Sequence, residues 1–238
     1  MIRKTAAAFF VTVFPFFLLM AAVLLVFQPW FLQFEYAKPD FPEDPFGYSI
    51  QERMTYGTTW LRYITHHQPD ASLSGLTSET GQPLYTDREL SHMKDAKTVY
   101  QSARNIWLLL VLLGIAFFFV LDKRKRKASF GTIFYKGSLI TLIGTGAILA
   151  GVIFAFQPLF SGFHALFFAE GTWLFYPTDS LIRLFPEKLW IDGFSAVGII
   201  TVMLSGIFLL IGRNFRSAEK HPRNRFDELE QQHQHDRT

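Results

Sequence analysis

The sequence predicts an all-α integral membrane protein, a four-helix transmembrane bundle with extracellular amphipathic and re-entrant helical segments. Three observations predict this class. Half of the 238 residues are hydrophobic, and the chain contains 27 Phe. The apolar residues gather in four long blocks separated by polar stretches, which is typical of membrane helices. The basic residues collect beside the ends of these blocks.

The four apolar blocks predict four spans. The first, at about 6–32, has no small-x-small cleavage site, so we interpret it as a retained helix. The second, 106–121, is short for a span and is expected to extend upstream. The third is 133–156, and its small residues at 144–151 could let a second helix approach closely, although a helix that is simply rich in glycine is an equal alternative. The fourth is 194–212.

Basic residues predict the orientation of the spans. Lys4 precedes the first block, 123–127 is an unbroken basic run, and further Arg and Lys residues follow Gly212. Because short cytoplasmic segments carry the excess of Lys and Arg, both termini are expected in the cytoplasm. The expected segments are a cytoplasmic N-terminus with the first span (1–32), a first extracellular segment (33–105), the second span with a basic turn (106–132), the third span (133–156), an extracellular aromatic interfacial segment (157–193), the fourth span (194–212) and a disordered cytoplasmic tail (213–238).

Composition excludes several kinds of chemistry. The chain has no cysteine, which removes disulfides, a thiolate nucleophile and a cysteine zinc site. No charged residue lies deep in an apolar block, which disfavours a transporter or a proton pump. No nucleotide-binding loop is present, and topology and anionic lipid explain the basic clusters better than nucleic acid does. Chemistry is therefore expected in the extracellular segments.

The first extracellular segment predicts two helices. Apolar residues recur at helical spacing over 50–64, which predicts an amphipathic helix on the outer leaflet or packed on the bundle. Further along, Thr86 and Glu89 form a capping-box pattern. That pattern predicts a helix that begins near Asp87 and runs directly into the second span.

Two histidines are the candidate site residues. Arg88, His92 and Asp95 share one face of the helix that begins near Asp87, at or just outside the level of the lipid headgroups. His164 lies in 160–190, a stretch rich in aromatic residues, which favour the membrane interface. Two histidines from different segments therefore reach one membrane surface. The residues alone support a shared site and two structural histidines about equally.

Several stretches of the chain match a known family. They are 89–97 (ELSHMKDAK), 163–168 (FHALFF), 173–179 and 181–186. The sequence resembles the lipoprotein intramolecular transacylase (Lit) family, four-span membrane proteins of Gram-positive bacteria, over nearly the whole chain before about Asn214. The family pattern prefers Val where this chain has Ala96, which is a small change.

The resemblance implies an enzyme, a membrane acyltransferase. It would move the sn-2 acyl chain of a lipoprotein's diacylglyceryl-cysteine onto the α-amino group of the same cysteine, leaving an N-acyl S-monoacylglyceryl (lyso) lipoprotein. The two family histidines correspond to His92 and His164. The expected partners are diacylated lipoproteins and membrane lipid, without nucleic acid, metal or cofactor; the oligomeric state is open and a monomer is compatible with it.

The residues suit this chemistry. An amine with a pKa near 8 is mostly protonated at pH 7, and a neutral imidazole is a suitable proton acceptor. We expect His92, oriented by Asp95, to be the general base, and His164 to stabilise the oxyanion or to protonate the leaving glycerol oxygen, although the roles could be exchanged. The residues expected to bind substrate or to support the site are Arg88, Glu89, Lys97, Phe167, Phe168, Trp173, Asp179 and Arg183.

Two alternatives stay open at this point. One is a metal-dependent membrane hydrolase that uses His92, His164 and Asp95 or Asp179 as ligands, but no His-Glu-x-x-His spacing supports it. The other is a non-enzymatic membrane protein that binds lipid or lipoprotein, with the aromatic segment as its groove.

Overall fold

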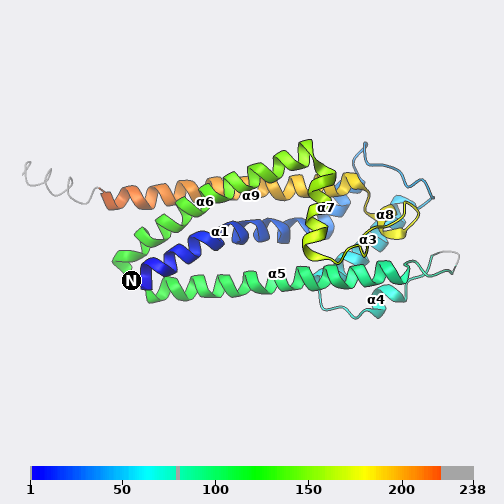
Figure 1. Ribbon diagram of the computed structural model, residues 1–238, viewed down its shortest axis with the longest axis horizontal. Helices are drawn as coiled ribbons and strands as arrows, with labels where there is room; N and C mark the ends of the chain where they lie inside the picture. Colours follow the sequence, from blue (N-terminus) through cyan, green and yellow to red (C-terminus); the bar gives the residue numbers. More distant parts are fainter. Residues whose placement is uncertain (1, 79–80, 221–238) are drawn as a thin grey trace, which may run out of the picture. The chain divides into compact units, whose positions relative to one another are not determined.

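The computed structural model describes residues 2–78 and 81–220 of the chain (Figure 1). The described part is almost entirely helical, and its one β feature is an isolated antiparallel bridge between Thr77 and Pro83. The all-α class predicted from the sequence is confirmed. The helices in chain order are α1 (Ile2–Val26), α2 (Pro29–Tyr36), α3 (Ile50–Thr65), α4 (Ala71–Ser74), α5 (Asp87–Val120), α6 (Lys123–Phe154), α7 (Phe156–Phe167), α8 (Ser180–Leu184) and α9 (Glu187–Lys220).

Within the described residues, 4 helices are long and apolar enough to cross a membrane. These candidate spans are Lys4–Val26, Asp87–Val120, Lys125–Phe154 and Glu187–Ser217. The prediction of an integral membrane protein with four spans is confirmed. Of the tail predicted as disordered from residue 213, the part up to Lys220 is helical in α9, and residues 221–238 lie outside the described residues.

Within the described residues, one compact unit joins the start of α1, up to Leu18, with 110–145 and 201–220. Its core contains Phe14 of α1, which contacts Phe134 of α6 at 5.7 Å and Phe208 of α9 at 5.5 Å between ring centroids. The rings of Phe134 and Phe208 are themselves 4.9 Å apart. Packed aromatic pairs of this kind stabilise a helix bundle in lipid through dispersion, because lipid tails supply no hydrophobic driving force.

Glycine allows α6 and α9 to touch within this unit. A Cβ atom built on Gly212 would lie 2.6 Å from the backbone nitrogen of Tyr135 and 3.0 Å from the carbonyl oxygen of Gly131. Backbone atoms cannot move aside as a flexible side chain can. Gly212 is therefore the position that permits this close crossing.

The glycines within 144–151 do not make the close helix contact that the sequence pattern suggested. A Cβ atom on Gly144 or Gly146 would meet nothing within 4 Å, and one on Gly151 would lie 3.5 Å from Leu159 of α7. The glycine of α6 that lies close to α9 is Gly131, nearer the start of α6, whereas within 144–151 it is the side chain of Leu149 that packs on Gly198 of α9. A run of small residues shows that an approach is sterically possible, but not which face of the helix meets a neighbour.

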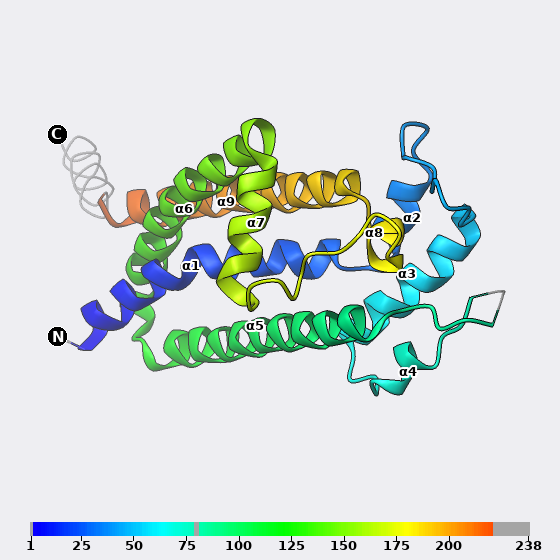
Figure 2. The same cartoon turned by 45° about the vertical axis from the view of Figure 1, so that its right-hand side comes forward.

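The other compact unit covers 19–109 and 146–200. Helix α3 begins with a capping box between Ser49 and Glu52, and its buried face includes Trp60 and Ile64. It packs against α2, α4 and α8 (Figure 2). The predicted amphipathic helix is therefore present and packs its apolar face on protein, with Trp60 4.6 Å from Phe185.

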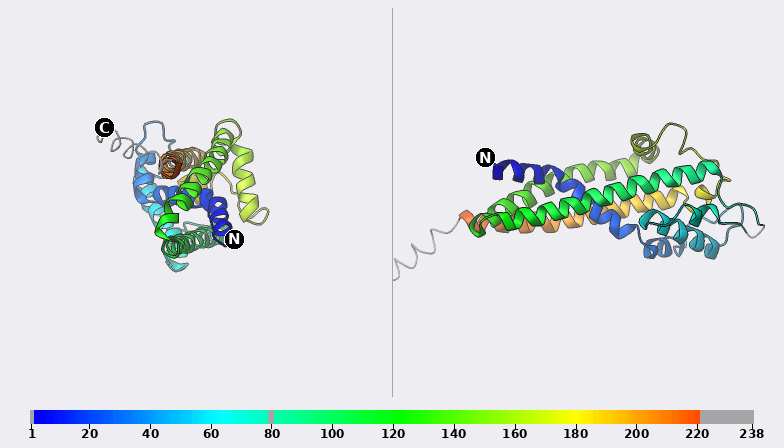
Figure 3. Two further views of the ribbon diagram at one scale, coloured as in Figure 1. Left: turned by 90° about the vertical axis from the view of Figure 1, so that its left-hand side faces the viewer. Right: turned by 90° about the horizontal axis from the view of Figure 1, so that it is seen from below.

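The aromatic segment after α6 starts as a helix that folds back. Ala155 separates α6 from α7, and both views of Figure 3 show α7 beside the last turns of α6. Further on, the hydroxyl of Tyr36 donates to the carbonyl oxygen of Leu184 at 2.7 Å, and Ser180 Oγ donates to the carbonyl oxygen of Leu84 at 2.5 Å. These bonds hold α8 against α2 and the start of α5.

A pair of glycine variants tests the helix crossing. We expect Gly212→Ala to destabilise the protein by about 1–3 kcal/mol, because its methyl group overlaps the backbone of α6. Gly206→Ala is the matched control on the same helix, since a Cβ there would meet nothing within 4 Å. The measurement is thermal unfolding of both variants in the same detergent. Equal melting temperatures for the two variants would contradict the proposed contact.

Candidate active site

Two buried histidines face each other in the unit that covers 19–109 and 146–200. His92 comes from the first turns of α5, and His164 is the buried residue of α7. Their ring centroids are 6.0 Å apart, and their planes are inclined by 21°. Each residue is 8% exposed. The structure thus brings together the two histidines that the sequence predicted to share a membrane surface.

Aromatic rings enclose the histidine pair. The ring centroid of His92 lies 4.7 Å from Phe168 and 5.4 Å from Phe175. The ring of His164 lies 4.1 Å from Phe160 and 4.9 Å from Trp173. Burial in this apolar surrounding lowers the pKa of His164 below its ordinary value, and the hydrogen bond to the Phe160 carbonyl only partly opposes that effect. His164 is therefore held as a neutral imidazole, able to accept a proton.

A backbone contact selects the tautomer of His164. Its Nδ1 lies 2.8 Å from the carbonyl oxygen of Phe160, one turn earlier in α7. A carbonyl oxygen can only accept, so Nδ1 carries the hydrogen and donates it. In the neutral ring, Nε2 then holds a lone pair, which is the arrangement a general base requires.

Two polar atoms of this cluster are buried without a partner in the described part of the chain. They are Nδ1 of His92 and Nε1 of Trp173. A buried polar group that stays unpaired costs free energy, so each such group in a native protein calls for an explanation. By contrast, the indole nitrogen of Trp190 donates to the carbonyl oxygen of Phe185 at 3.1 Å. The unpaired atoms of His92 and Trp173 mark where a substrate could make hydrogen bonds.

An ion pair positions the aromatic loop over His92. Arg88, one turn before His92, donates to Asp179 Oδ2 at 2.8 Å. The same carboxylate oxygen accepts from the backbone nitrogen of Tyr176 at 2.8 Å. The Arg88 guanidinium also lies over the ring of Phe175, 5.3 Å from its centroid. Arg88 and Asp179 therefore act on the histidine pair through the placement of Phe175.

Glu89 and Arg183 support the site from further away. Glu89 is 1% exposed and accepts hydrogen bonds from the backbone nitrogens of Thr86 and Leu181, each at 2.7 Å. Arg183 pairs with Asp44 at 2.8 Å. Burial alone would raise the pKa of the Asp44 carboxyl, but the hydrogen bonds from Arg183 and the Tyr48 backbone, together with the charge of Arg183, lower that pKa overall.

Two of the residues expected to bind substrate or to support the site, Lys97 and Phe167, lie elsewhere. Lys97 donates to the carbonyl oxygen of Gln68 at 2.5 Å and lies over the ring of Tyr63, so it fastens the loop after α3 to α5. Phe167 is 45% exposed, whereas its neighbour Phe168 contacts both histidines.

Asp95 does not orient His92 as expected. Its side chain is exposed and forms no hydrogen bond or ion pair with any described residue, and Nδ1 of His92 has no partner. The helical spacing placed both residues on one face. However, His92 points into the aromatic enclosure, while Asp95 lies one turn further along and outside it.

The sequence interpretation missed two contributors. Phe160 supplies the carbonyl that selects the His164 tautomer, and Phe175 covers His92. The sequence did contain a signal for Phe160, which precedes His164 by four residues in a helix, the spacing of a helical hydrogen bond. The position of Phe175 had no signal in the sequence, because it depends on the Arg88–Asp179 pair.

Among the described residues, no group of three or more His, Asp or Glu side chains could hold a metal ion, so the hydrolase alternative lacks a ligand set there.

Comparisons with known proteins find a similar chain and similar folds. An uncharacterized protein of Aquifex aeolicus (strain VF5) is 26% identical over 212 residues, which cover 88% of this chain and 94% of that protein. The in meso structure of the lipoprotein intramolecular transacylase Lit from Bacillus cereus matches with a TM-score of 0.75 at 17% identity, covering 92% of this chain and 98% of that one. A histidine-to-arginine variant of the same protein matches with a TM-score of 0.69, covering 92% and 94%.

The family itself is identified by a match over most of the chain. Residues 8–190 match the model of the family described as Lipoprotein intramolecular transacylase Lit. The resemblance noted from the sequence motifs is confirmed. The protein therefore belongs to the lipoprotein intramolecular transacylase (Lit) family, whose members are membrane acyltransferases.

Proposed function

We propose that the protein moves the sn-2 acyl chain of a lipoprotein's diacylglyceryl-cysteine onto the α-amino group of that same cysteine. The observation that carries this proposal is the pair of facing, buried histidines, one of which has a tautomer set for proton acceptance. The product would be an N-acyl S-monoacylglyceryl (lyso) lipoprotein. The substrates would be diacylated lipoproteins held in membrane lipid.

The reaction exchanges one bond to the acyl carbon for another. The neutral α-amine attacks the ester carbonyl carbon, a C–N bond forms, and the carbonyl electron pair moves onto oxygen. A histidine takes one proton from the attacking nitrogen. The intermediate then collapses, the bond to the sn-2 glycerol oxygen breaks, and that oxygen receives a proton. An ester and an amine become an amide and an alcohol, with no net change in protons.

We assign the base role to His164. Its Nδ1 is occupied by the Phe160 carbonyl, which leaves Nε2 as the acceptor. His92 would then stabilise the oxyanion or deliver the proton to the glycerol oxygen. This is the reverse of the assignment that the sequence favoured, and it follows from the two backbone environments: His164 has an orienting partner, whereas Nδ1 of His92 has none.

Trp173 is a candidate donor to the substrate. Its indole N–H is buried, unpaired and part of the enclosure, with its ring 4.9 Å from that of His164. An N–H fixed in a dry site stabilises developing negative charge without reorganising when the reaction occurs. We assign it to the oxygen of the acyl carbonyl, which becomes an oxyanion in the intermediate.

The substrate supplies much of the acceleration. Amine and ester belong to one molecule, and well-oriented intramolecular reactions reach effective molarities of roughly 10⁵ M or more. The enzyme has to hold the two groups together and move a proton. No protein nucleophile is needed for this reaction, which suits a chain without cysteine.

We place the site on the extracellular side, with both termini in the cytoplasm. The support is the basic run 123–127, which begins α6 just after the end of α5, whereas His92 lies in the first turns of α5. The ester of a membrane-bound lipoprotein lies at headgroup depth, where the first turns of α5 would emerge from the bilayer.

Histidine variants test the proposal directly. We expect His92→Ala and His164→Ala each to lower lyso-lipoprotein formation by at least about 10²-fold, the usual contribution of general acid–base catalysis. The measurement is mass spectrometry of lipoprotein N-termini after expression in a strain that lacks the gene. His66→Ala is the matched control, because the His66 side chain is exposed and its hydrogen bond is to the adjacent Thr65. Full activity in both site variants at normal protein levels would contradict the proposed catalysis and favour a role in lipid binding.

A tryptophan pair tests the indole donor. Trp173→Phe keeps an aromatic ring and removes the N–H, so we expect kcat to fall about 10–100-fold with a smaller change in KM. Trp190→Phe removes an N–H that is already bonded within the protein. That variant should lose thermal stability with little loss of kcat. If both variants changed kcat equally, Trp173 would contribute packing and not a hydrogen bond to the substrate.

The pH dependence of kcat/KM tests the base. Below about pH 8 the substrate amine becomes protonated, so log kcat/KM should fall with a slope of one. Burial lowers the pKa of His164, so the neutral imidazole persists below the ordinary value of 6.5. The slope of log kcat/KM against pH should therefore increase from one to two only below pH 6.5, where His164 also becomes protonated. A second break at or above 6.5, with folding intact, would argue against a buried histidine base.

A further inference from the structure

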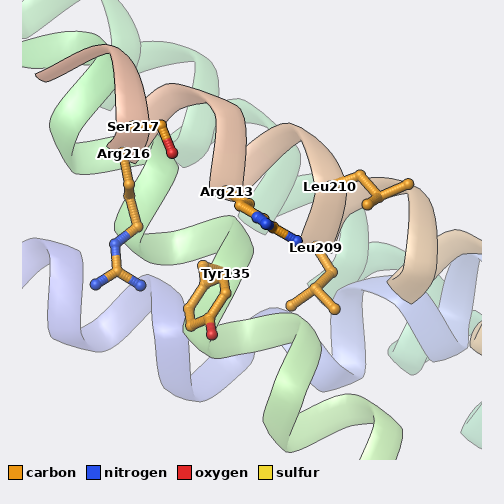
Figure 4. Close-up of a pocket in the computed structure, with 6 residues that line it drawn as sticks. All are labelled: Tyr135, Leu209, Leu210, Arg213, Arg216 and Ser217. Atoms are coloured by element: carbon orange, nitrogen blue, oxygen red, sulfur yellow. The ribbon is translucent and has the colours of Figure 1, made fainter. Parts of the chain in front are cut away.

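A cavity lies in the other compact unit, between α6 and α9. It has a volume of about 340 Å³ (Figure 4). Its lining residues are Tyr135, Leu209, Leu210, Arg213, Arg216 and Ser217. None of these residues belongs to the histidine site or to the reaction proposed for it.

The α9 residues of this cavity form an apolar part and a basic part. Leu209 and Leu210 come first, followed at helical spacing by Arg213, Arg216 and Ser217, so all lie on one side of α9. Ser217 is also where the candidate span in α9 ends. The leucines therefore lie within the apolar part of the helix, and the arginines lie at its end.

Two arginines of the cavity have no acidic partner among the described residues. In the part of the chain that the structure describes, neither Arg213 nor Arg216 forms an ion pair, although eight other ion pairs are formed there. Arg216 instead lies over the ring of Tyr135, 4.5 Å from its centroid. Figure 4 shows Tyr135 with Arg213, Arg216 and the other residues that line the cavity. A guanidinium presents several N–H donors in a fixed plane, a geometry that matches phosphate oxygens.

The helix crossing fixes this arrangement. The backbone nitrogen of Tyr135 would be 2.6 Å from a Cβ on Gly212, the residue directly before Arg213. Tyr135 and Arg213 thus start from backbones in contact, and their side chains diverge around the cavity. The close backbone contact at Gly212 therefore holds the starting points of the Tyr135 and Arg213 side chains near each other.

We propose that this cavity binds the phosphate group of an anionic phospholipid. Arg213 and Arg216 would donate to the phosphate oxygens, the hydroxyls of Tyr135 and Ser217 would add neutral donors, and an acyl chain would lie along the leucines. Basic pockets between spans at the cytoplasmic side are suited to such headgroups. The site would hold an inner-leaflet lipid, remote in function from acyl transfer.

The leucines distinguish a lipid from free phosphate. Leu209 and Leu210 offer no hydrogen bond to a small anion, but they offer an apolar surface to a chain. Leu210 is 61% exposed, as expected of a residue that contacts lipid. An ordinary topology signal needs only positive charge at the end of a span. It needs neither a cavity nor hydroxyl groups aligned with the arginines.

Native mass spectrometry of the full chain tests the site. Phosphatidylglycerol is titrated against phosphatidylcholine for the wild type, for the double variant Arg213→Gln with Arg216→Gln, and for the control double variant Lys123→Gln with Lys127→Gln. The control removes the same charge from exposed side chains outside the cavity. We expect the arginine variant to bind phosphatidylglycerol about tenfold more weakly and the lysine variant less than about twofold. Equal losses in both variants would show a bulk charge effect and overturn the proposal.

Two further arms identify the ligand and guard against misfolding. Inorganic phosphate and glycerol phosphate should fail to displace the lipid at equal concentration, because neither contacts the leucines. Displacement by either would make this a free-phosphate site and refute the lipid assignment.

If the double variant does not fold, the single variant Arg213→Gln should still weaken phosphatidylglycerol binding about threefold, and unchanged binding would refute the site. The lyso-lipoprotein assay should be unchanged in the folded variants.

Discussion

The carboxylate of Glu89 is the interaction on which the rest of the site depends. One of its oxygens accepts from the backbone nitrogen of Thr86 and caps α5, and the other accepts from the backbone nitrogen of Leu181 at the start of α8. A buried charge is tolerated only when its hydrogen bonds are satisfied, so these donors cannot be exchanged for others without a large cost. A single side chain thereby joins the helix that carries His92 to the segment that follows His164.

That junction explains how an aromatic segment can enclose two histidines. With α8 held at the start of α5, the residues between α7 and α8 have to cross the first turns of α5. The Arg88–Asp179 pair completes the crossing and lays Phe175 over His92. The enclosure is apolar, and burial in it lowers the pKa of His164, while polar atoms of His92 and Trp173 have no partner among the described residues. Those properties suit a reaction whose nucleophile and ester both arrive with the substrate.

The two compact units contain different kinds of interaction. One holds buried histidines, ion pairs and satisfied carboxylates around chemistry at an ester. The other is built from phenylalanine rings and a glycine crossing, with arginines at the end of its span. Substitutions can therefore be chosen that affect one function and leave the other as an internal control.

The sequence by itself determined the helical class, the four candidate spans, the start of α5 at its capping box and the identity of the two histidines. These properties follow from local composition and spacing, which act over one helix at a time. Only the tertiary structure decided that His164 is the oriented histidine, that Asp95 stands outside the site, and that Trp173 keeps an unpaired N–H. Each of these depends on which direction a side chain faces after distant segments pack, and helical periodicity carries no information about that direction.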